Sequence, residues 1–175
     1  YHRSENEINS LAKNSISISE YDYDFINNVV PKKYIAIVLG GEWQYKIYNK
    51  WDEVIEKITF NDKELSIIFI GSANAKRSSY NLLKKFPQQH ILDFVERLSF
   101  NQSVEVIRRA DILLCCDGGL MHAANAVGAN IISLFARLTP EMLTTETSKS
   151  NFLFDKKDVN NIPSKEVVNK YFKVN

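Results

Sequence analysis

The sequence has no long hydrophobic run and no surplus of charge of one sign. Its 175 residues include 22 lysines and arginines against 21 aspartates and glutamates, a formal net charge of +1. This balance gives no whole-domain electrostatic basis for binding nucleic acid or an anionic surface. No run of about 18 apolar residues occurs, so no transmembrane segment is expected. The polar start YHRSENEINS is not typical of a signal peptide.

Cysteine is scarce, and its placement excludes two common roles. Cys115 and Cys116 are adjacent within an apolar run. Neighbouring side chains of a strand point to opposite faces, so a disulfide between these two is not expected. No CxxC spacing with nearby histidines occurs, so the sequence predicts no zinc site. Two reduced, buried thiols are typical of a cytoplasmic protein.

Two familiar nucleotide-binding motifs are also missing. The chain contains neither the GxxxxGK[ST] of a P-loop nor the GxGxxG of a dinucleotide-binding turn. A phosphate site in this protein therefore has to be built from other elements.

A regular alternation of apolar strands and amphipathic helices fills most of the chain. The apolar segments predict buried strands at residues 34–40, 65–71, 90–94, 111–116 and 129–135. Helical patterns alternate with them at residues 51–58, 74–86, 101–110 and 120–127. A capped terminal helix is expected after Pro163. This order predicts an α/β fold, a parallel sheet with helices on both faces.

The first 33 residues do not follow this pattern, and we expect them to form a linker helix and a connector. Residues 4–14 predict a short helix with Ser4 and Glu7 as a capping box. The polar stretch from Ser15 to Lys33 is interpreted mainly as a connector. The domain itself is expected to cover residues 34–175. Because the chain begins with Tyr1 and not with methionine, we expect a fragment or a processed product.

Parallel sheets of this type bind ligands beyond the carboxyl ends of their strands. One such end carries Gly118 and Gly119, between the strand at 111–116 and the next helix. Glycine permits a close approach of ligand to backbone, and a helix N-terminus favours an anion. An ordinary tight turn is the alternative interpretation of these two glycines.

The side chains around this turn favour a ligand site. Leu120, Ala123, Ala124 and Val127 form the apolar stripe of the predicted helix, and His122 lies roughly opposite it. A histidine there is able to donate a hydrogen bond to phosphate, although an inconsequential surface histidine is the other option.

Asp117 precedes the glycines and repels phosphate, because both groups are negatively charged. Its carboxylate is suited to capping the helix or to accepting hydrogen bonds from hydroxyl groups of a ligand.

A second candidate loop follows the first strand. Gly40 and Gly41 end that strand, and Lys46 lies before the next helix. A lysine is a mobile point charge suited to phosphate, whereas a solvated lysine is the alternative. The topology brings this loop to the same sheet edge as residues 117–119, so we expect the two loops to act together.

These features, in this order, resemble the C-terminal half of glycosyltransferase family 9, which contains the ADP-heptose:lipopolysaccharide heptosyltransferases. Lys46 and the Ile47–Asn49 segment resemble the lysine loop of the family. Residues 117–124, DGGLMHAA, resemble its Asp-Thr/Ser-Gly-x-x-His motif. Residues 134–140, LFARLTP, resemble its Leu-Phe-Gly-x-Thr-x-Pro-like segment. Residues 2–14 are similar to the helix that joins its two domains.

The resemblance implies a Rossmann-like domain that forms one half of a GT-B arrangement, the half that holds the nucleotide sugar. The donor-binding residues that it implies are Gly41, Lys46, Asp117, Gly118, Gly119, His122 and Thr139. Lys46 and the amides near Gly118 and Gly119 would meet the diphosphate. Asp117 would face the donor sugar or order the loop, and His122 would support the phosphate end. The resemblance implies no metal, since the family transfers sugars without a metal-binding DxD motif, and no cofactor is expected. No catalytic residue is expected in this chain, because the family's general base lies in its N-terminal domain.

The sequence departs from the family pattern at four places. Gly118 replaces a hydroxyl residue, Ala136 replaces a glycine, and Asn49 stands where proline is common. Residues 71–77, GSANAKR, lack the acidic residue that many members carry near the nucleoside.

We therefore expect the donor-binding domain of an inverting, metal-independent glycosyltransferase of lipopolysaccharide or surface-glycan synthesis. Its expected partners are a nucleotide diphosphate sugar, ADP-heptose-like or other, and an acceptor glycan bound through a missing N-terminal domain. No nucleic acid partner is expected. The expected location is cytoplasmic, with peripheral contact at the inner membrane face, and the isolated chain is expected to be inactive. The alternative is a non-catalytic nucleotide-binding or interaction module that retains the fold.

Overall fold

The strands of the chain pair side by side in one parallel sheet. The computed structural model describes residues 16–139 and 151–174. Within these residues the sheet has six strands in the order β3-β2-β1-β4-β5-β6, and every neighbouring pair is parallel. The strands are β1 (Ile35–Val38), β2 (Ile67–Ile70), β3 (Ile91–Asp93), β4 (Ile112–Cys116), β5 (Ile131–Ala136) and β6 (Phe152–Asp155).

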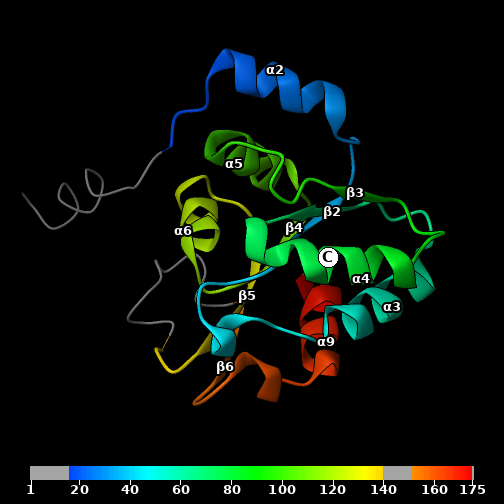
Figure 1. Ribbon diagram of the computed structural model, residues 1–175, viewed down its shortest axis with the longest axis vertical. Coiled ribbons are helices and arrows are strands. Elements are labelled where there is room, and N and C mark those ends of the chain that lie inside the picture. The colour runs from blue at the N-terminus through cyan, green and yellow to red at the C-terminus, as the bar shows by residue number, and fades with distance from the viewer. Residues whose placement is uncertain (1–15, 140–150, 175) are drawn as a thin grey trace, which may run out of the picture.

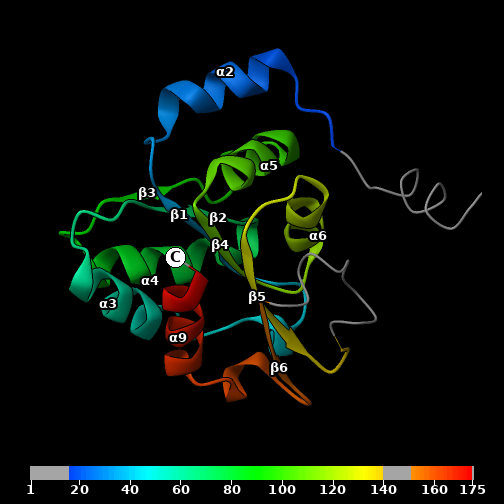
Figure 2. The same ribbon diagram turned by 180° about the vertical axis from the view of Figure 1, so that it is seen from behind.

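Helices cover both faces of this sheet, as Figures 1 and 2 show from opposite sides. One face carries α2 (Glu20–Val29), α5 (Phe100–Arg109) and α6 (Gly119–Ala126). The other face carries α3 (Trp51–Asn61), α4 (Lys76–Lys85) and α9 (Ser164–Val174). Three short 3-10 turns complete the described elements: η1 (Gln44–Lys46), η2 (Ala73–Ala75) and η3 (Val159–Asn161). Among these helices none is long and apolar enough to cross a membrane.

The sheet is apolar on both faces because each face is covered by helices. Ile37 and Phe69 pair across β1 and β2 and belong to the cluster under α3, α4 and α9. Ala36 and Ile68 pair in the same strands and belong to the cluster under α2, α5 and α6. The alternation of strand side chains thus divides one sheet between two cores.

The predicted α/β fold is confirmed, as are the strands and helices expected after residue 33. The interpretation of Ser15–Lys33 as mainly a connector is wrong, because residues 20–29 form α2. The Ser19 side chain caps this helix, and Ile26 is fully buried beneath it. The sequence signal is weak, since Ile26 is the one buried residue among the ten of α2. Strand β6 was not expected, and the helix expected at residues 4–14 lies outside the described residues.

Both cysteines are free and buried, which confirms that they do not form a disulfide. Burial raises the pKa of the Cys116 thiol to about 12, so the thiol is neutral near pH 7. The same effect raises the pKa of Cys115 well above its ordinary value.

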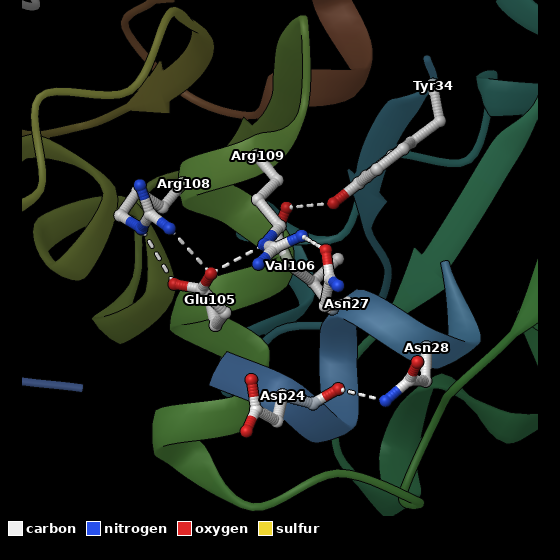
Figure 3. A network of polar contacts seen from close by, with 8 residues as sticks. All are labelled: Asp24, Asn27, Asn28, Tyr34, Glu105, Val106, Arg108 and Arg109. Carbon is white, nitrogen blue, oxygen red and sulfur yellow. Dashed lines mark hydrogen bonds and ion pairs between the residues drawn. The ribbon is translucent and has the colours of Figure 1, made fainter. Parts of the chain in front are cut away.

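A charged cluster fastens α2 to α5 (Figure 3). The Glu105 side chain is fully buried and accepts hydrogen bonds from Arg108 Nε at 2.7 Å and from Arg109 Nε at 2.6 Å. Arg109 also donates to Asn27 of α2 at 2.6 Å, and the ring of Tyr23 lies 4.4 Å from its guanidinium. Burial by itself raises the pKa of Glu105, but the two arginines outweigh it and hold the pKa below its ordinary value. The cluster therefore depends on Glu105 staying ionised.

We predict that Glu105→Gln lowers the free energy of unfolding by about 1–3 kcal/mol, the range of charge-assisted hydrogen bonds. The loss of stability should fall in the lower half of this range, because the Arg108 side chain is 41% exposed and its charge is therefore screened by water. Since the folded-state pKa of Glu105 is lowered, its contribution is present above the unfolded-state pKa. That contribution is lost as pH falls through the lower folded-state value. Urea unfolding at neutral and acidic pH measures both effects.

The matched control is Glu56→Gln, at an exposed position of α3. It should change the unfolding midpoint little at either pH. An equal effect of the two substitutions would contradict the special role of Glu105.

Candidate functional site

A cleft of about 510 Å³ lies beyond the carboxyl ends of β1 and β4. The strand order reverses between these two strands, because β2 and β3 lie to one side of β1 while β5 and β6 lie beyond β4. The segments that follow β1 and β4 therefore leave toward opposite faces and open a crevice between them. The cleft is lined by residues of both segments and their neighbours: Val38–Trp43, Lys46, Gly71, Ser72, Asn74, Phe100 and Cys116–Met121.

The lysine loop forms one wall of the cleft. Gly40 has a φ of +80°, and a Cβ at this position would lie 2.5 Å from Asn74 Oδ1. Asn74 Nδ2 donates a hydrogen bond of 2.8 Å to the carbonyl of Gly41. After η1, Asn160 accepts from the N–H of Asn49 at 2.7 Å. The loop is therefore tied at its start to the β2–α4 connection and at its end to η3.

Lys46 reaches from this loop across the cleft to Asp117. Its amine forms an ion pair and hydrogen bond with Asp117 Oδ2. The Asp117 side chain is 4% exposed and that of Lys46 is 16% exposed, so the pair is largely withdrawn from water. Asp117 does not serve as the N-cap residue of α6, which is Gly118. Its observed role is to hold the lysine.

The turn after β4 presents an open helix N-terminus to the cleft. Among the described residues no side chain hydrogen bond caps α6 at its N-cap, Gly118. The helical hydrogen bonds begin with the N–H of Met121, which donates to the carbonyl of Gly118 at 3.0 Å. The N–H groups of Gly119 and Leu120 precede them, and both residues line the cleft with Lys46 and Asp117. Gly118 has an extended φ of 172°, and a Cβ there would meet nothing within 4 Å. The backbone therefore does not require glycine at the position where the family has a hydroxyl residue.

His122 lies at the rim of the site. Its side chain is 50% exposed, and Nε2 lies 3.7 Å from Asp117 Oδ1. The prediction that His122 faces away from the core is confirmed. The buried face of α6 differs slightly from the expected stripe, because Met121 is buried with Ala123 and Ala124. Leu120 is only partly buried there.

Five of the residues singled out from the sequence line one cleft: Gly41, Lys46, Asp117, Gly118 and Gly119. His122 contacts this group through Asp117, whereas Thr139 lies three residues beyond β5 and is not part of the described lining.

Sequence reasoning missed several residues that shape the same cleft. Trp43 and Phe100 line its mouth, and their rings are 54% and 55% exposed. Asn74 and Asn160 hold the lysine loop by hydrogen bonds that join positions 33 and 111 residues apart. The two asparagines carry no local signal. The two rings had local hints in the sequence: Trp43 lies shortly after Gly41, and Ser99 is a helix-capping residue that places Phe100 at the start of a helix.

Cys116 also lines the cleft, but its raised pKa keeps the thiol neutral. Within the described residues no group of three histidine, cysteine, aspartate or glutamate side chains is placed to hold a metal ion. The charge available to a ligand here therefore comes from Lys46, Glu42, Asp117, His122 and the end of α6.

This strand order and the crevice at its reversal define a Rossmann-like α/β domain. A family model described as glycosyltransferase family 9 (heptosyltransferase) matches residues 5–174. The chain belongs to this family, which confirms the resemblance drawn from its motifs.

Solved structures share the fold at low sequence identity. The structure of E. coli ADP-heptose lps heptosyltransferase II superposes with a TM-score of 0.74 at 16% identity, over 91% of this chain and 53% of that one. An E. coli heptosyltransferase with ADP gives 0.69 at 15% identity, over 91% and 51%. The C-terminal domain of a Francisella tularensis group 1 glycosyl transferase gives 0.58 at 15%, over 94% and 86%.

The chain thus spans about half the length of the heptosyltransferases that it resembles. Its fold agrees with the expected half of a GT-B glycosyltransferase. A search of curated proteins gave no match.

We predict opposite outcomes for alanine at two glycines of this cleft. Gly40→Ala should cost roughly 1–3 kcal/mol of stability, because φ is positive and Asn74 occupies the space. Gly118→Ala should cost less, about 1 kcal/mol or below, because the added Cβ meets open space and only the preference of an N-cap for glycine over alanine opposes it. Chemical unfolding of the two variants measures the difference, and equal destabilisation would contradict the described geometry.

Proposed function

We propose that this chain is the donor-binding domain of a glycosyltransferase and that a nucleotide diphosphate sugar binds in the cleft between β1 and β4. The observation that carries the proposal is the convergence of Lys46 and the first turn of α6 on one cleft. Both features favour a diphosphate, the first by its charge and the second by its free N–H groups. Family membership and the similar E. coli heptosyltransferase with ADP support an adenine nucleotide as the first ligand to test.

The Lys46–Asp117 pair sets the electrostatics of this cleft before a ligand enters. Asp117 neutralises the lysine and holds it beside the helix N-terminus. A diphosphate competes with Asp117 for the amine, and the two anions repel each other when both are close. We propose that Lys46 turns its hydrogen bonds toward the diphosphate while Asp117 accepts from a hydroxyl of the sugar.

This arrangement suits stabilisation of a leaving group. In glycosyl transfer the bond from the sugar to the nucleoside diphosphate breaks, and negative charge grows on the departing diphosphate. Lys46 and the positive end of α6 lie where that charge would develop, so they would lower the barrier electrostatically. We propose that the base that deprotonates the acceptor hydroxyl, and the acceptor site itself, lie outside this chain, and that the transfer is inverting and metal-independent.

The mouth of the cleft offers apolar surface beside this charged centre. Trp43 comes from the lysine loop and Phe100 from the start of α5. Each ring is about half exposed, and flat aromatic faces of this kind stack on bases and sugars. We propose that these rings contact the nucleoside and the sugar of the donor. We also propose a role in lipopolysaccharide or surface-glycan synthesis on the cytoplasmic side, and membership of the family supports it.

We predict that Lys46→Gln weakens binding of ADP, GDP or UDP, whichever binds best, by roughly 1.5–3 kcal/mol. Glutamine removes the charge and keeps a donor for Asp117, which limits the loss of stability. Lys63→Gln, at an exposed lysine after α3, is the matched control. Isothermal titration gives both affinities. If Lys46→Gln binds the same nucleotide with unchanged affinity, Lys46 does not contact the bound nucleotide.

We predict that His122→Ala weakens nucleotide binding while leaving the unfolding midpoint of the free protein nearly unchanged. The half-exposed ring contributes little to packing but lies beside the phosphate site. Thermal unfolding with and without nucleotide separates the effects, because ligand stabilises the folded state according to its affinity. A loss of more than about 2 kcal/mol without ligand would mark His122 as a structural residue.

The alternative is a domain that binds a nucleotide without taking part in transfer, and Gly118 favours it. A serine or threonine at this position would supply one more hydrogen bond to phosphate, and the open space around the Cβ position would accommodate its side chain. The two functions differ in whether the sugar contributes to binding. A donor domain should bind a nucleotide sugar with contacts to the sugar, whereas a nucleotide module should bind the free diphosphate at least as well.

A further inference from the structure

Arg137, the first residue after β5, has an unusual backbone conformation. Its φ is +68°, in the left-handed region that non-glycine residues rarely adopt. The N–H of Leu138 donates to the carbonyl of Ala136 at 2.8 Å, which closes a three-residue turn around Arg137. A turn of this hand with a central arginine is strained, and it persists where surrounding contacts hold it.

The contacts that hold Arg137 come from two other parts of the chain, the lysine loop and the end of β6. Its guanidinium carbon lies 3.8 Å from the centre of the Tyr45 ring. Its Nε donates to the carbonyl of Lys157 at 3.3 Å, and its backbone N–H donates to the carbonyl of Asp155 at 3.3 Å. Arg137 therefore joins the ends of β5 and β6 to the lysine loop.

Tyr45 is the residue immediately before Lys46. Both belong to η1, a single turn of three residues that has little stability of its own. The Trp43 ring of the same loop stacks on the Tyr45 ring, with the two ring centres 6.4 Å apart and an interplanar angle of 22°. The Lys46 amine lies 5.9 Å from the centre of the same Tyr45 ring. The ring is thus the common neighbour of the arginine and of the lysine.

We propose that Arg137 is a positioning residue that holds Lys46 in the cleft by stacking on Tyr45. The proposal rests on the proposed function in one respect, that Lys46 is the ligand of the diphosphate. Arg137 is not among the residues that line the cleft, so it acts through the loop and not on the nucleotide. A planar guanidinium is suited to this role, because it stacks on the ring and donates to Lys157 at the same time.

Two measurements test the proposal on Arg137→Ala. The first is hydrogen exchange of the amides of Lys46 and Ile47, which close η1 by bonds of 2.9 and 3.1 Å to Trp43 and Gln44. Exchange should become several-fold faster in the variant. The second is the affinity for ADP, which should weaken about three- to tenfold, as expected from one aromatic–cation contact.

Companion variants separate positioning from direct contact. Tyr45→Ala should reproduce the effect of Arg137→Ala on both measurements, and the double variant should add nothing further. Tyr45→Phe keeps the ring and should behave as the wild type. In a Lys46→Gln background, Arg137→Ala should no longer change the affinity for ADP. Arg97→Ala, at an exposed arginine before α5, is the matched control.

Unchanged exchange at Lys46 and Ile47 in Arg137→Ala would overturn the proposal, whatever the affinity for ADP. A loss of affinity that persists in the Lys46→Gln background would also overturn it, since Arg137 would then act on the nucleotide directly. If the wild-type protein binds none of ADP, GDP and UDP, the proposed function fails. The exchange measurement still decides whether Arg137 orders the loop.

Discussion

The reversal of strand order between β1 and β4 is the constraint on which the rest of this structure depends. Because α3 follows β1 onto one face and α6 follows β4 onto the other, their connections separate at the carboxyl edge of the sheet. A cleft remains between these two diverging connections and is lined by residues of both. The sheet below it is built of strands that are buried on both faces, which gives the cleft a closely packed floor.

Within this cleft an ion pair decides how charge is presented. Lys46 and Asp117 come from opposite walls and neutralise each other as a pair that is largely withdrawn from water. The proposed diphosphate would have to compete with a carboxylate for the lysine, and the open end of α6 would favour it. The charged pair of the cleft is balanced and has no excess of one sign, consistent with the net charge of +1 of the chain.

The periphery of the domain holds its parts together through specific polar contacts. Glu105 and its two arginines fix α2 on α5, while Asn74, Asn160 and Arg137 fix the lysine loop from three directions. The bond from Arg109 to Asn27 and the contacts of the lysine loop join segments that are distant in sequence. A loop with so little secondary structure of its own needs such contacts, since a single 3-10 turn does not order it.

The sequence by itself determined the class of fold and the two glycine-bearing loops, because buried parallel strands read as short apolar runs and helices as periodic ones. It also placed His122 away from the core and Lys46 at the sheet edge of Asp117. It did not reveal α2, whose single buried residue gives no periodicity, nor β6, a half-buried edge strand. Only the tertiary structure decided that Asp117 binds Lys46 instead of capping α6, and that Arg137 stacks on Tyr45. These pairs are 71 and 92 residues apart, and their geometry is set by the packing of the strands between them, which no local pattern records.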